Sequence, residues 1–306
     1  MPSAAANADR FRELHRRHRL FVLPNAWDVP SARIFEDAGF PAVATSSAGM
    51  MVSLGYPDGE GIPRAEYLAA VRRIAEKVAI PLSVDIVAGF GPTVAEAVET
   101  VRQVIAIGGV GVNLEDVDPA TERLRPLEAQ LERVRAIREY AEEAGVPVVL
   151  NARTDALTHG AGTPRDRFRE AVRRARAYRD AGADCVYPMR LVEGDAIARF
   201  LAETPGPLNV MVRPGLPTLP ELERIGVRRV SFGPAASYAA LGLLRRVAAD
   251  ILGARSFEAL LDGALTFDDL NRLARPAHGS GVAQEIPPSG RARAGPRRSR
   301  RPSRRS

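Results

Sequence analysis

Two apolar runs in the first half of the chain each end on an acidic residue. Residues 81–84 lead into Asp85 and a Gly-rich loop, and residues 109–114 lead into Glu115, with a helical pattern between them. A buried strand that ends on a carboxylate brings this group to one end of a sheet, so two neighbouring strands of this kind bring their acids together. Converging oxygen ligands are what a hard cation such as Mg²⁺ requires. A role as a helix cap or turn residue is the alternative for either acid alone.

The residues at the ends of the other apolar runs are mostly polar, which favours a site over two isolated caps. If the strands are parallel, all of these residues lie at the same end of the sheet, where α/β barrels place their active sites. The strand-end residues are Asn25, Trp27, Asp28, Ser46, Ser47, Asn151, Arg153, Asp155, Met189, Arg190, Val212, Arg213 and Gly233.

The elements that must position these residues alternate as strand and helix about eight times. The expected strands are residues 20–23, 41–45, 81–85, 109–115, 146–156, 183–190, 207–212 and 227–235. The expected helices are residues 28–39, 64–78, 94–107, 127–144, 165–181, 193–203, 219–225, 237–252, 257–261 and 267–273. Near-continuous apolar strands are typical of parallel strands buried on both faces. The pattern predicts an α/β fold, a (β/α)₈ TIM barrel over residues 20–275, after an N-terminal helical segment at residues 1–19.

The composition is that of an ordinary globular protein, with 45% hydrophobic and 26% charged residues. No apolar run reaches the roughly 18 residues that span a bilayer. Residues 1–19 lack the apolar core of a signal peptide. The single cysteine, Cys185, rules out an intrachain disulfide and fits a reducing compartment. We therefore expect a cytoplasmic protein without a membrane partner.

The positive charge of the chain is concentrated at its C-terminus. Residues 289–306 contain eight Arg and no acid, so removing them takes the formal net charge from +6 to −2. A Pro/Ser/Gly/Arg segment of this kind cannot pack a core, and we predict a disordered basic tail over residues 276–306. Such tails can bind polyanions. We favour a solvated extension without nucleic-acid contact.

Several motifs follow one another between about residues 20 and 252: PNAWD, TSSAG, LGYPDG, AGFG, VNLED, NARTDA and the late stretch NVMVRPGLPTLPELERIGVRRVSFGP. In this order they resemble the isocitrate lyase/phosphoenolpyruvate mutase superfamily. The resemblance implies a barrel that binds Mg²⁺ (or Mn²⁺) and makes or breaks a C–C or P–C bond. The bond lies beside the carboxylate of a small 2-oxo or 2-hydroxy acid. The resemblance also implies a homodimer or homotetramer that exchanges the eighth helix, here residues 234–252.

The resemblance further implies which acids handle the metal. Asp85 resembles the direct metal ligand, and Asp58 and Glu115 resemble the carboxylates that hold metal-bound waters. Arg153 matches the arginine that binds the departing or transferring group. We expect Asp58, Glu115 and Arg153 to serve catalysis, because a cation and a guanidinium can both stabilise a developing enolate or anion.

The resemblance also implies a binding site for the substrate carboxylate. Ser46, Ser47 and Ala48 match a turn whose hydroxyl and backbone N–H groups bind it, alongside Arg153. Trp27 is a candidate wall of the same pocket, with simple packing as the alternative. 

Three features depart from the superfamily pattern. Val87 stands where an acid is common, which should weaken metal binding. The loop after Glu115 has no Cys, His or Lys, whereas the lyases carry a Lys-Lys-Cys-Gly-His motif there, whose cysteine protonates the leaving enolate. Tyr187 stands near a position where the phosphonate branch often has His. His159 is a candidate general acid or base, with a solvated loop position as the alternative.

From these features we predict a Mg²⁺-dependent lyase that gives a pyruvate-like enolate by C–C cleavage or decarboxylation. A P–C bond enzyme of the phosphonopyruvate hydrolase, phosphonomutase or carboxyphosphonoenolpyruvate type is the first alternative. A barrel that binds an oxo acid without turning it over is the second, because the metal site and the mobile loop depart from the pattern.

Overall fold

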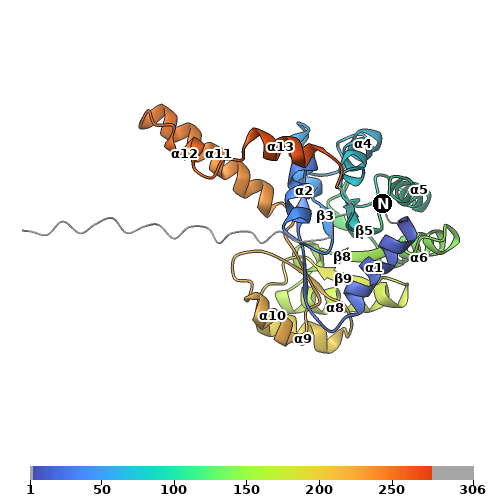
Figure 1. The fold of residues 1–306 in the computed structure, drawn as a ribbon. Coiled ribbons are helices and arrows are strands. Elements are labelled where there is room, and N and C mark those ends of the chain that lie inside the picture. The colour runs from blue at the N-terminus through green and yellow to red at the C-terminus, as the bar shows by residue number, and fades with distance from the viewer. Residues whose placement is uncertain (1–2, 278–306) are drawn as a thin grey trace, which may run out of the picture.

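Residues 3–277 of the 306-residue chain are described by the computed structural model, and they form an α/β fold built on parallel strands (Figure 1). The parallel strands are β1 (Phe21–Leu23), β2 (Asn25–Ala26), β3 (Val43–Thr45), β4 (Leu82–Asp85), β5 (Gly111–Leu114), β8 (Val149–Thr154), β9 (Cys185–Pro188), β10 (Asn209–Met211) and β11 (Arg229–Ser231). A short antiparallel pair, β6 (Val117–Asp118) and β7 (Arg123–Leu124), follows β5.

The parallel strands pair in two runs. One run has the order β2-β3-β4-β5-β8-β9, and the other has the order β1-β11-β10. β1 and β2 follow each other directly in the chain. β1 pairs with β11 and β2 pairs with β3, so residues 21–26 connect the two runs at one end. A parallel bridge between Val186 of β9 and Leu208, just before β10, connects the other ends of the two runs. The arrangement is TIM-barrel-like.

Helices alternate with these strands, as the sequence pattern predicts. They are α1 (Ala4–Arg16), α2 (Val29–Asp37), α3 (Ser47–Ser53), α4 (Arg64–Ala75), α5 (Val94–Ala106), α6 (Leu127–Glu143), α7 (Ala156–His159), α8 (Pro164–Asp180), α9 (Gly194–Glu203), α10 (Leu219–Ile225), α11 (Ala235–Gly253), α12 (Glu258–Leu261) and α13 (Phe267–Ala274). Capping boxes begin several of them: at α5, Thr93 Oγ1 accepts from Glu96 N at 3.2 Å while Glu96 Oε2 accepts from Thr93 N at 2.9 Å. Over residues 3–277, no helix is long and apolar enough to cross a membrane.

Alternation along the strands separates an apolar outer layer from a polar interior. In β5, Val112 and Leu114 belong to the main hydrophobic cluster between the strands and the helices. Asn113, between them, instead lines a cavity enclosed by the strands. The period of two in strand side chains produces this division. The polar side chains therefore lie on the inner face of the strands, and the apolar packing of their outer face against the helices is kept.

A second hydrophobic cluster holds α1 against the N-terminal ends of the strands. Phe11 of α1 is fully buried there with Leu23, Val110 and Val149. A Cβ on Gly111 would lie 2.5 Å from the Phe11 ring, so this glycine is needed for the close approach. The N-terminal helical segment therefore packs on the main domain, at the end opposite the strand C-termini.

Several short elements, among them α3, α7 and the β6–β7 pair, were not expected from the sequence. Residues 47–53, for which the sequence pattern predicts no helix, form α3, which Ser46 caps by accepting from Gly49 N at 3.2 Å. The segment has seven residues, about two helical turns, which is too short for a periodicity signal. The loop after Glu115 contains the β6–β7 pair, which the Arg125–Asp118 ion pair supports at 2.9 Å.

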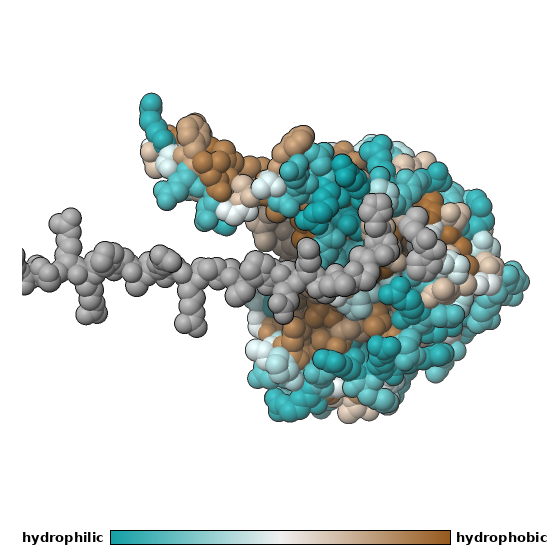
Figure 2. Space-filling model, in the orientation of Figure 1, coloured by the Kyte–Doolittle hydropathy of each residue, from teal (hydrophilic) through white to brown (hydrophobic). Residues whose placement is uncertain are grey.

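The C-terminal helices of the described part are unusual in their exposure. α11 and α12 project away from the body (Figure 1), and a hydrophobic patch lies along part of the projection, next to hydrophilic residues (Figure 2). Only Ser237 and Val247 of the nineteen α11 residues are buried. α13 turns back onto α2, where Leu273 is buried and Arg272 pairs with Asp37. The predicted basic tail lies, from residue 278 onward, outside the described residues.

Candidate active site

A cavity of about 220 Å³ opens at the C-terminal ends of the strands and extends down into their interior. Most of its lining residues have polar or charged side chains, which is unusual for the centre of a fold and marks the cavity as a candidate site. Its lining residues are Asn25, Ala44, Thr45, Ser46, Ser47, Ala48, Asp58, Ser83, Asp85, Asn113, Asn151, Arg153, Tyr187, Met189, Asn209, Met211, Arg213, Arg229, Ser231, Gly233, Pro234 and Tyr238.

Asp85 is the acid that the structure holds most firmly in this cavity. It ends β4, where its backbone N–H donates to Thr45 Oγ1 at 2.9 Å and its carbonyl accepts from Tyr67 Oη at 2.7 Å. Its Oδ1 accepts from Asn113 Nδ2 at 3.0 Å, and its Oδ2 accepts from Ser47 N at 3.2 Å. These neutral donors orient the carboxylate but leave its charge uncompensated. Among the described residues, no cationic side chain pairs with it.

Asp58 approaches the same cavity from the loop between α3 and α4. Its side chain is exposed at the rim, yet partial desolvation and the charge of Asp85 both raise its pKa. The second cause shows that the two carboxylates are close enough to repel each other. Within residues 3–277, neither acid forms an ion pair, so the pair favours the approach of a cation.

Arg153, at the end of β8, is held in place by two carboxylates. Its Nε and Nη2 donate to the two oxygens of Asp155 at 2.7 and 2.8 Å, and its Nη1 donates to Glu115 Oε1 at 2.6 Å. Burial opposes its charge, but Glu115 and Asp155 raise the pKa of Arg153 well above its usual value. Three of the five guanidinium N–H groups are engaged, which leaves two for a ligand in the cavity.

Glu115 lies behind Arg153 and does not line the cavity. Burial raises its pKa well above the usual value, against the effect of Arg153, and the charge of Asp85 adds to the rise. The sequence prediction that Glu115 lies at the same end of the fold as Asp85 is correct. Its direct contact, however, is with the arginine.

Asp155 could be read from sequence as a helix cap or as a support for Arg153, and the structure distinguishes the two. Its side chain makes no capping hydrogen bond to α7, and both its oxygens accept from Arg153. Its backbone N–H donates to Asp116 Oδ1 at 2.9 Å. Asp116 is fully buried, and its Oδ2 accepts from Tyr178 Oη at 2.7 Å and Arg174 Nη1 at 3.1 Å. This network fixes the backbone that carries the Arg153 fork.

The residues predicted to bind the substrate carboxylate lie at the start of α3. Ser46 caps this helix, and Ser47 and Ala48 form its first residues; all three line the cavity. Backbone N–H groups in the first turn of a helix lack intrahelical acceptors. Ser47 uses its N–H on Asp85, so α3 and the β4 acid are coupled.

Three residues singled out in the sequence lie elsewhere. Trp27 is half-buried against the main core and is not among the lining residues. His159 is exposed on α7 and contacts Thr158 Oγ1 through Nδ1 at 2.9 Å. Val87 is buried in the main core, and its φ of 49° is a left-handed conformation that costs a β-branched residue strain. Val87 does not line the cavity, but its backbone N–H donates to Asp85 Oδ1 at 3.3 Å, so the effect of an acid at position 87 on the metal stays a prediction.

Sequence reasoning missed the lower part of the cavity. Asn113, Asn209 and Arg229 line it, although none stands at the end of its apolar run; Tyr187, noted in the sequence only for the absence of a His, lines the cavity as well. Tyr187 donates through Oη to Met211 Sδ at 3.0 Å, and the Arg153 guanidinium lies 5.8 Å from its ring centroid. The available signal was a polar residue at alternate positions within a strand, as in the sequence GVNL of β5.

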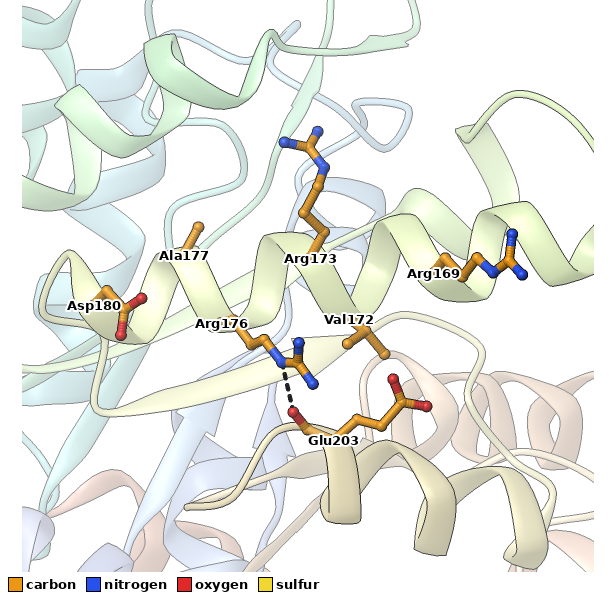
Figure 3. Close-up of a pocket in the computed structure, with 7 residues that line it drawn as sticks. All are labelled: Arg169, Val172, Arg173, Arg176, Ala177, Asp180 and Glu203. Atoms are coloured by element: carbon orange, nitrogen blue, oxygen red, sulfur yellow. Dashed lines mark hydrogen bonds between the residues drawn. The ribbon is translucent and has the colours of Figure 1, made fainter.

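A larger depression of about 440 Å³ lies on the outside of the molecule, between α8 and α9 (Figure 3). Its arginines already have acidic or carbonyl partners. Arg173 pairs with Glu170 at 2.7 Å, and Arg176 donates to the Glu203 carbonyl at 2.7 Å. Because it is remote from the strand C-termini and its charges are paired, we do not consider it the active site.

The position of the cavity places the chain in the class of TIM-barrel-like enzymes, which act at the C-terminal ends of their strands. A family comparison narrows the class. The model of the phosphoenolpyruvate phosphomutase family matches residues 11–252, and the chain belongs to this family, within the isocitrate lyase/phosphoenolpyruvate mutase superfamily of lyases and mutases.

Individual relatives differ in the reactions for which they are named. The chain is 32% identical over 248 residues to phosphonopyruvate hydrolase of Variovorax sp., covering 76% of this chain and 82% of the relative. It is 28% identical over 277 residues to 2,3-dimethylmalate lyase of Eubacterium barkeri, covering 87% and 93%. A solved structure of oxaloacetate acetylhydrolase with its product oxalate has 26% identity, covers 90% of this chain and 95% of that chain, and gives a TM-score of 0.78.

Proposed function

We propose that this protein is a Mg²⁺-dependent lyase that cleaves a C–C bond, or decarboxylates, in a small 2-oxo or 2-hydroxy carboxylate. The observation that carries the proposal is the pair Asp85 and Asp58, two cavity acids without a cationic partner among the described residues, opposite a fixed Arg153. The product is a pyruvate-like enolate, whose charge the site must stabilise.

The residues of the cavity fit a water-rich metal site. No group of three Asp, Glu, His or Cys side chains in residues 3–277 converges as a complete set of ligands. Asp85 would hold the ion directly, and Asp58 would do so through water. Mg²⁺ suits this arrangement because it keeps several of its waters. When bound, the ion would supply electrostatic stabilisation of charge that develops on the oxygens of the oxo acid.

The protein's own groups account for binding and orientation. The start of α3 offers the backbone N–H of Ala48 and the hydroxyls of Ser46 and Ser47 to the substrate carboxylate, since the N–H groups of Ser46 and Ser47 already donate to the Ala26 carbonyl and to Asp85. Arg153 offers its two remaining N–H groups to the departing group. The volume of about 220 Å³ limits the substrate to a small acid. Burial of the Arg153 pair beside Tyr187 keeps water away from that side of the reacting centre.

P–C bond chemistry is the second candidate function. It is favoured by the 32% identity to a phosphonopyruvate hydrolase over 82% of that protein. The oxaloacetate acetylhydrolase and dimethylmalate lyase similarities favour C–C cleavage, and both cover most of this chain. A fixed guanidinium suits either a carboxylate or a phosphonate.

A substrate panel with and without Mg²⁺ tests the proposal. We expect Mg²⁺-dependent product release from at least one 2-oxo or 2-hydroxy acid in a set containing oxaloacetate, 2-methylisocitrate and 2,3-dimethylmalate. Release of phosphate from phosphonopyruvate would assign the second candidate instead. Saturable binding of oxalate without turnover of any panel member would assign the non-catalytic alternative and contradict both reactions.

The quaternary structure we propose is a closed barrel that pairs with a second copy by exchanging α11. Its support is the apolar face of α11, where Tyr238, Leu241 and Leu244 are at least half exposed. A helix with so much exposed apolar surface is expected to be covered by a partner. A homodimer, or a homotetramer of two such pairs, would bury it.

Replacing Leu241 and Leu244 together with Glu should convert the oligomer into a monomer. Two charges in an interface core would have to be desolvated, which costs several kcal/mol, about enough to raise the dissociation constant 10³-fold. Light scattering coupled to size exclusion measures the mass. Leu219→Glu is the matched control, because Leu219 is an exposed leucine on α10. A wild-type protein that is already monomeric at micromolar concentration would contradict the proposal.

A further inference from the structure

The cavity floor contains a buried cation without a partner. Arg229, the first residue of β11, is 2% exposed, and its Nε and Nη1 are sealed from solvent without a hydrogen bond to any described residue. It nevertheless lines the cavity. A buried unpaired charge costs several kcal/mol, and proteins rarely retain one without a ligand.

The strand register explains why Arg229 points inward. In β11, Arg229 and Ser231 lie on the same side, two residues apart, and both line the cavity. Arg229 pairs in register with Asn209 of β10, whose side chain donates to Ser231 Oγ at 3.0 Å. The preceding residue, Arg228, points the other way, to the Gly226 carbonyl and to His18. The double arginine of this strand therefore has one inner and one outer member.

The groups around Arg229 do not neutralise it. Burial and the charge of Arg229 itself lower the pKa of His15 to about 3, so this histidine on α1 is neutral. Burial raises the pKa of Cys185 to about 11, so its thiol is neutral as well. Asp85 contributes an attractive charge, but only as the smallest of the effects on Arg229. Burial lowers the pKa of Arg229, and among the described residues no acid forms an ion pair with its guanidinium.

The floor also has polar groups that could complete a ligand shell. Asn113 must donate to the Asp85 carboxylate, which fixes its amide, so its Oδ1 accepts from Asn151 Nδ2 at 2.8 Å. The hydrogen-bonded series Asp85–Asn113–Asn151 lies between the acidic upper part of the cavity and the basic floor. Ser231 supplies a hydroxyl beside Arg229. A ligand with a negative group at the end that reaches the floor would place this group beside the positive charge of Arg229.

We propose that Arg229 forms a second anion-binding subsite, at the floor of the cavity, for a small anion such as a carboxylate or a halide. If the anion is the far carboxylate of the substrate, the substrate class of the proposed enzyme narrows to dicarboxylic acids, and this part rests on the proposed function. If it is an inorganic ion, the subsite serves folding and the charge balance of the barrel. In both cases the guanidinium of Arg229 is the principal donor.

Anion-dependent melting of the metal-free protein tests the subsite without relying on the proposed reaction. Wild type, Arg229→Gln, Arg229→Lys and the matched control Arg228→Gln are titrated in a chloride-free sulfonate buffer containing EDTA. The probes are chloride, bromide, acetate and malonate at constant ionic strength. We expect saturable stabilisation of wild type and Arg228→Gln. We expect the dissociation constant of the stabilising anion to rise about tenfold to 100-fold in Arg229→Gln, with partial retention in Arg229→Lys.

The source of the anion follows from the probes. Stabilisation by malonate but not by acetate or the halides identifies the far carboxylate of a diacid. Stabilisation by chloride and bromide, with bromide located beside Arg229 by anomalous scattering, identifies an inorganic ion. Without any anion, Arg229→Gln should melt at the same temperature as wild type or higher, because it removes an unpaired charge.

Two results would overturn the proposal. One is equal anion dependence in wild type and Arg229→Gln, which would mean that water alone satisfies the guanidinium. The other is loss of cooperative folding in both Arg229→Gln and Arg229→Lys, which would assign a purely structural role. Failure of the substrate panel, by contrast, would leave the halide and malonate results unaffected.

Discussion

Asp85→Asn should abolish metal-dependent turnover, with a loss of kcat/KM on the order of 10³-fold, about 4 kcal/mol. The substitution removes the cavity carboxylate that we propose as the direct metal ligand. It should also remove Mg²⁺ binding measured by calorimetry without substrate. One amide N–H of the new side chain would face an N–H of Asn113 or Ser47, so a stability loss of about 1–3 kcal/mol is expected as well.

The control for this variant is Asp195→Asn, which removes an exposed acid from the first turn of α9. It should keep wild-type Mg²⁺ affinity and turnover. The thermal midpoint of Asp85→Asn separates unfolding from loss of the metal: the protein should remain folded at the assay temperature. Full metal-dependent turnover in Asp85→Asn would show that the acid at the end of β4 does not hold the ion.

Arg153→Lys should lower kcat/KM by about 10²- to 10³-fold. A single ammonium cannot reproduce the fork to Asp155, reach Glu115 and still present N–H groups to the cavity. The loss should appear mainly in kcat if the guanidinium binds the departing group more strongly in the transition state than in the bound substrate. Steady-state kinetics on the best substrate of the panel measures it.

Two further variants help to assign the cause of this loss of kcat/KM. Asp155→Asn keeps one acceptor for Arg153 but weakens the fork, so we expect a smaller decrease, about tenfold. Arg123→Lys, at an exposed arginine of β7, is the matched control and should be neutral. Wild-type kcat/KM in Arg153→Lys would indicate that the arginine only compensates Glu115 and Asp155 and does not touch substrate.

Most of the helices and strands were predictable from sequence, because the periodicity of their apolar residues and the capping residues at their ends indicate the same boundaries. α10 occupies residues 219–225 as predicted, since a capping box at Thr218 and Glu221 and the left-handed Gly226 mark its two ends. The predicted and observed bounds of α6 differ by one residue at its C-terminus. α3 was missed because seven residues are too few for a helical period to emerge.

The candidate site was predictable in part, for a topological reason. Parallel strands bring their C-terminal residues to one end, so Ser46, Asp85 and Arg153 were expected together and do line one cavity. Strand-end position does not specify side-chain direction. Glu115 therefore contacts Arg153 instead of the open cavity, and Trp27 packs against the core.

The sequence by itself determined the alternation of strands and helices, the family, and the acids and arginine at the strand ends, because these depend on periodicity and on short motifs. Only the tertiary structure decided which charges compensate one another. Asp155 and Glu115 engage Arg153, whereas Asp85 and Arg229 lack partners of opposite charge among the described residues. The physical reason is that electrostatic pairing depends on distances of a few ångströms between residues tens of positions apart, which no local pattern encodes.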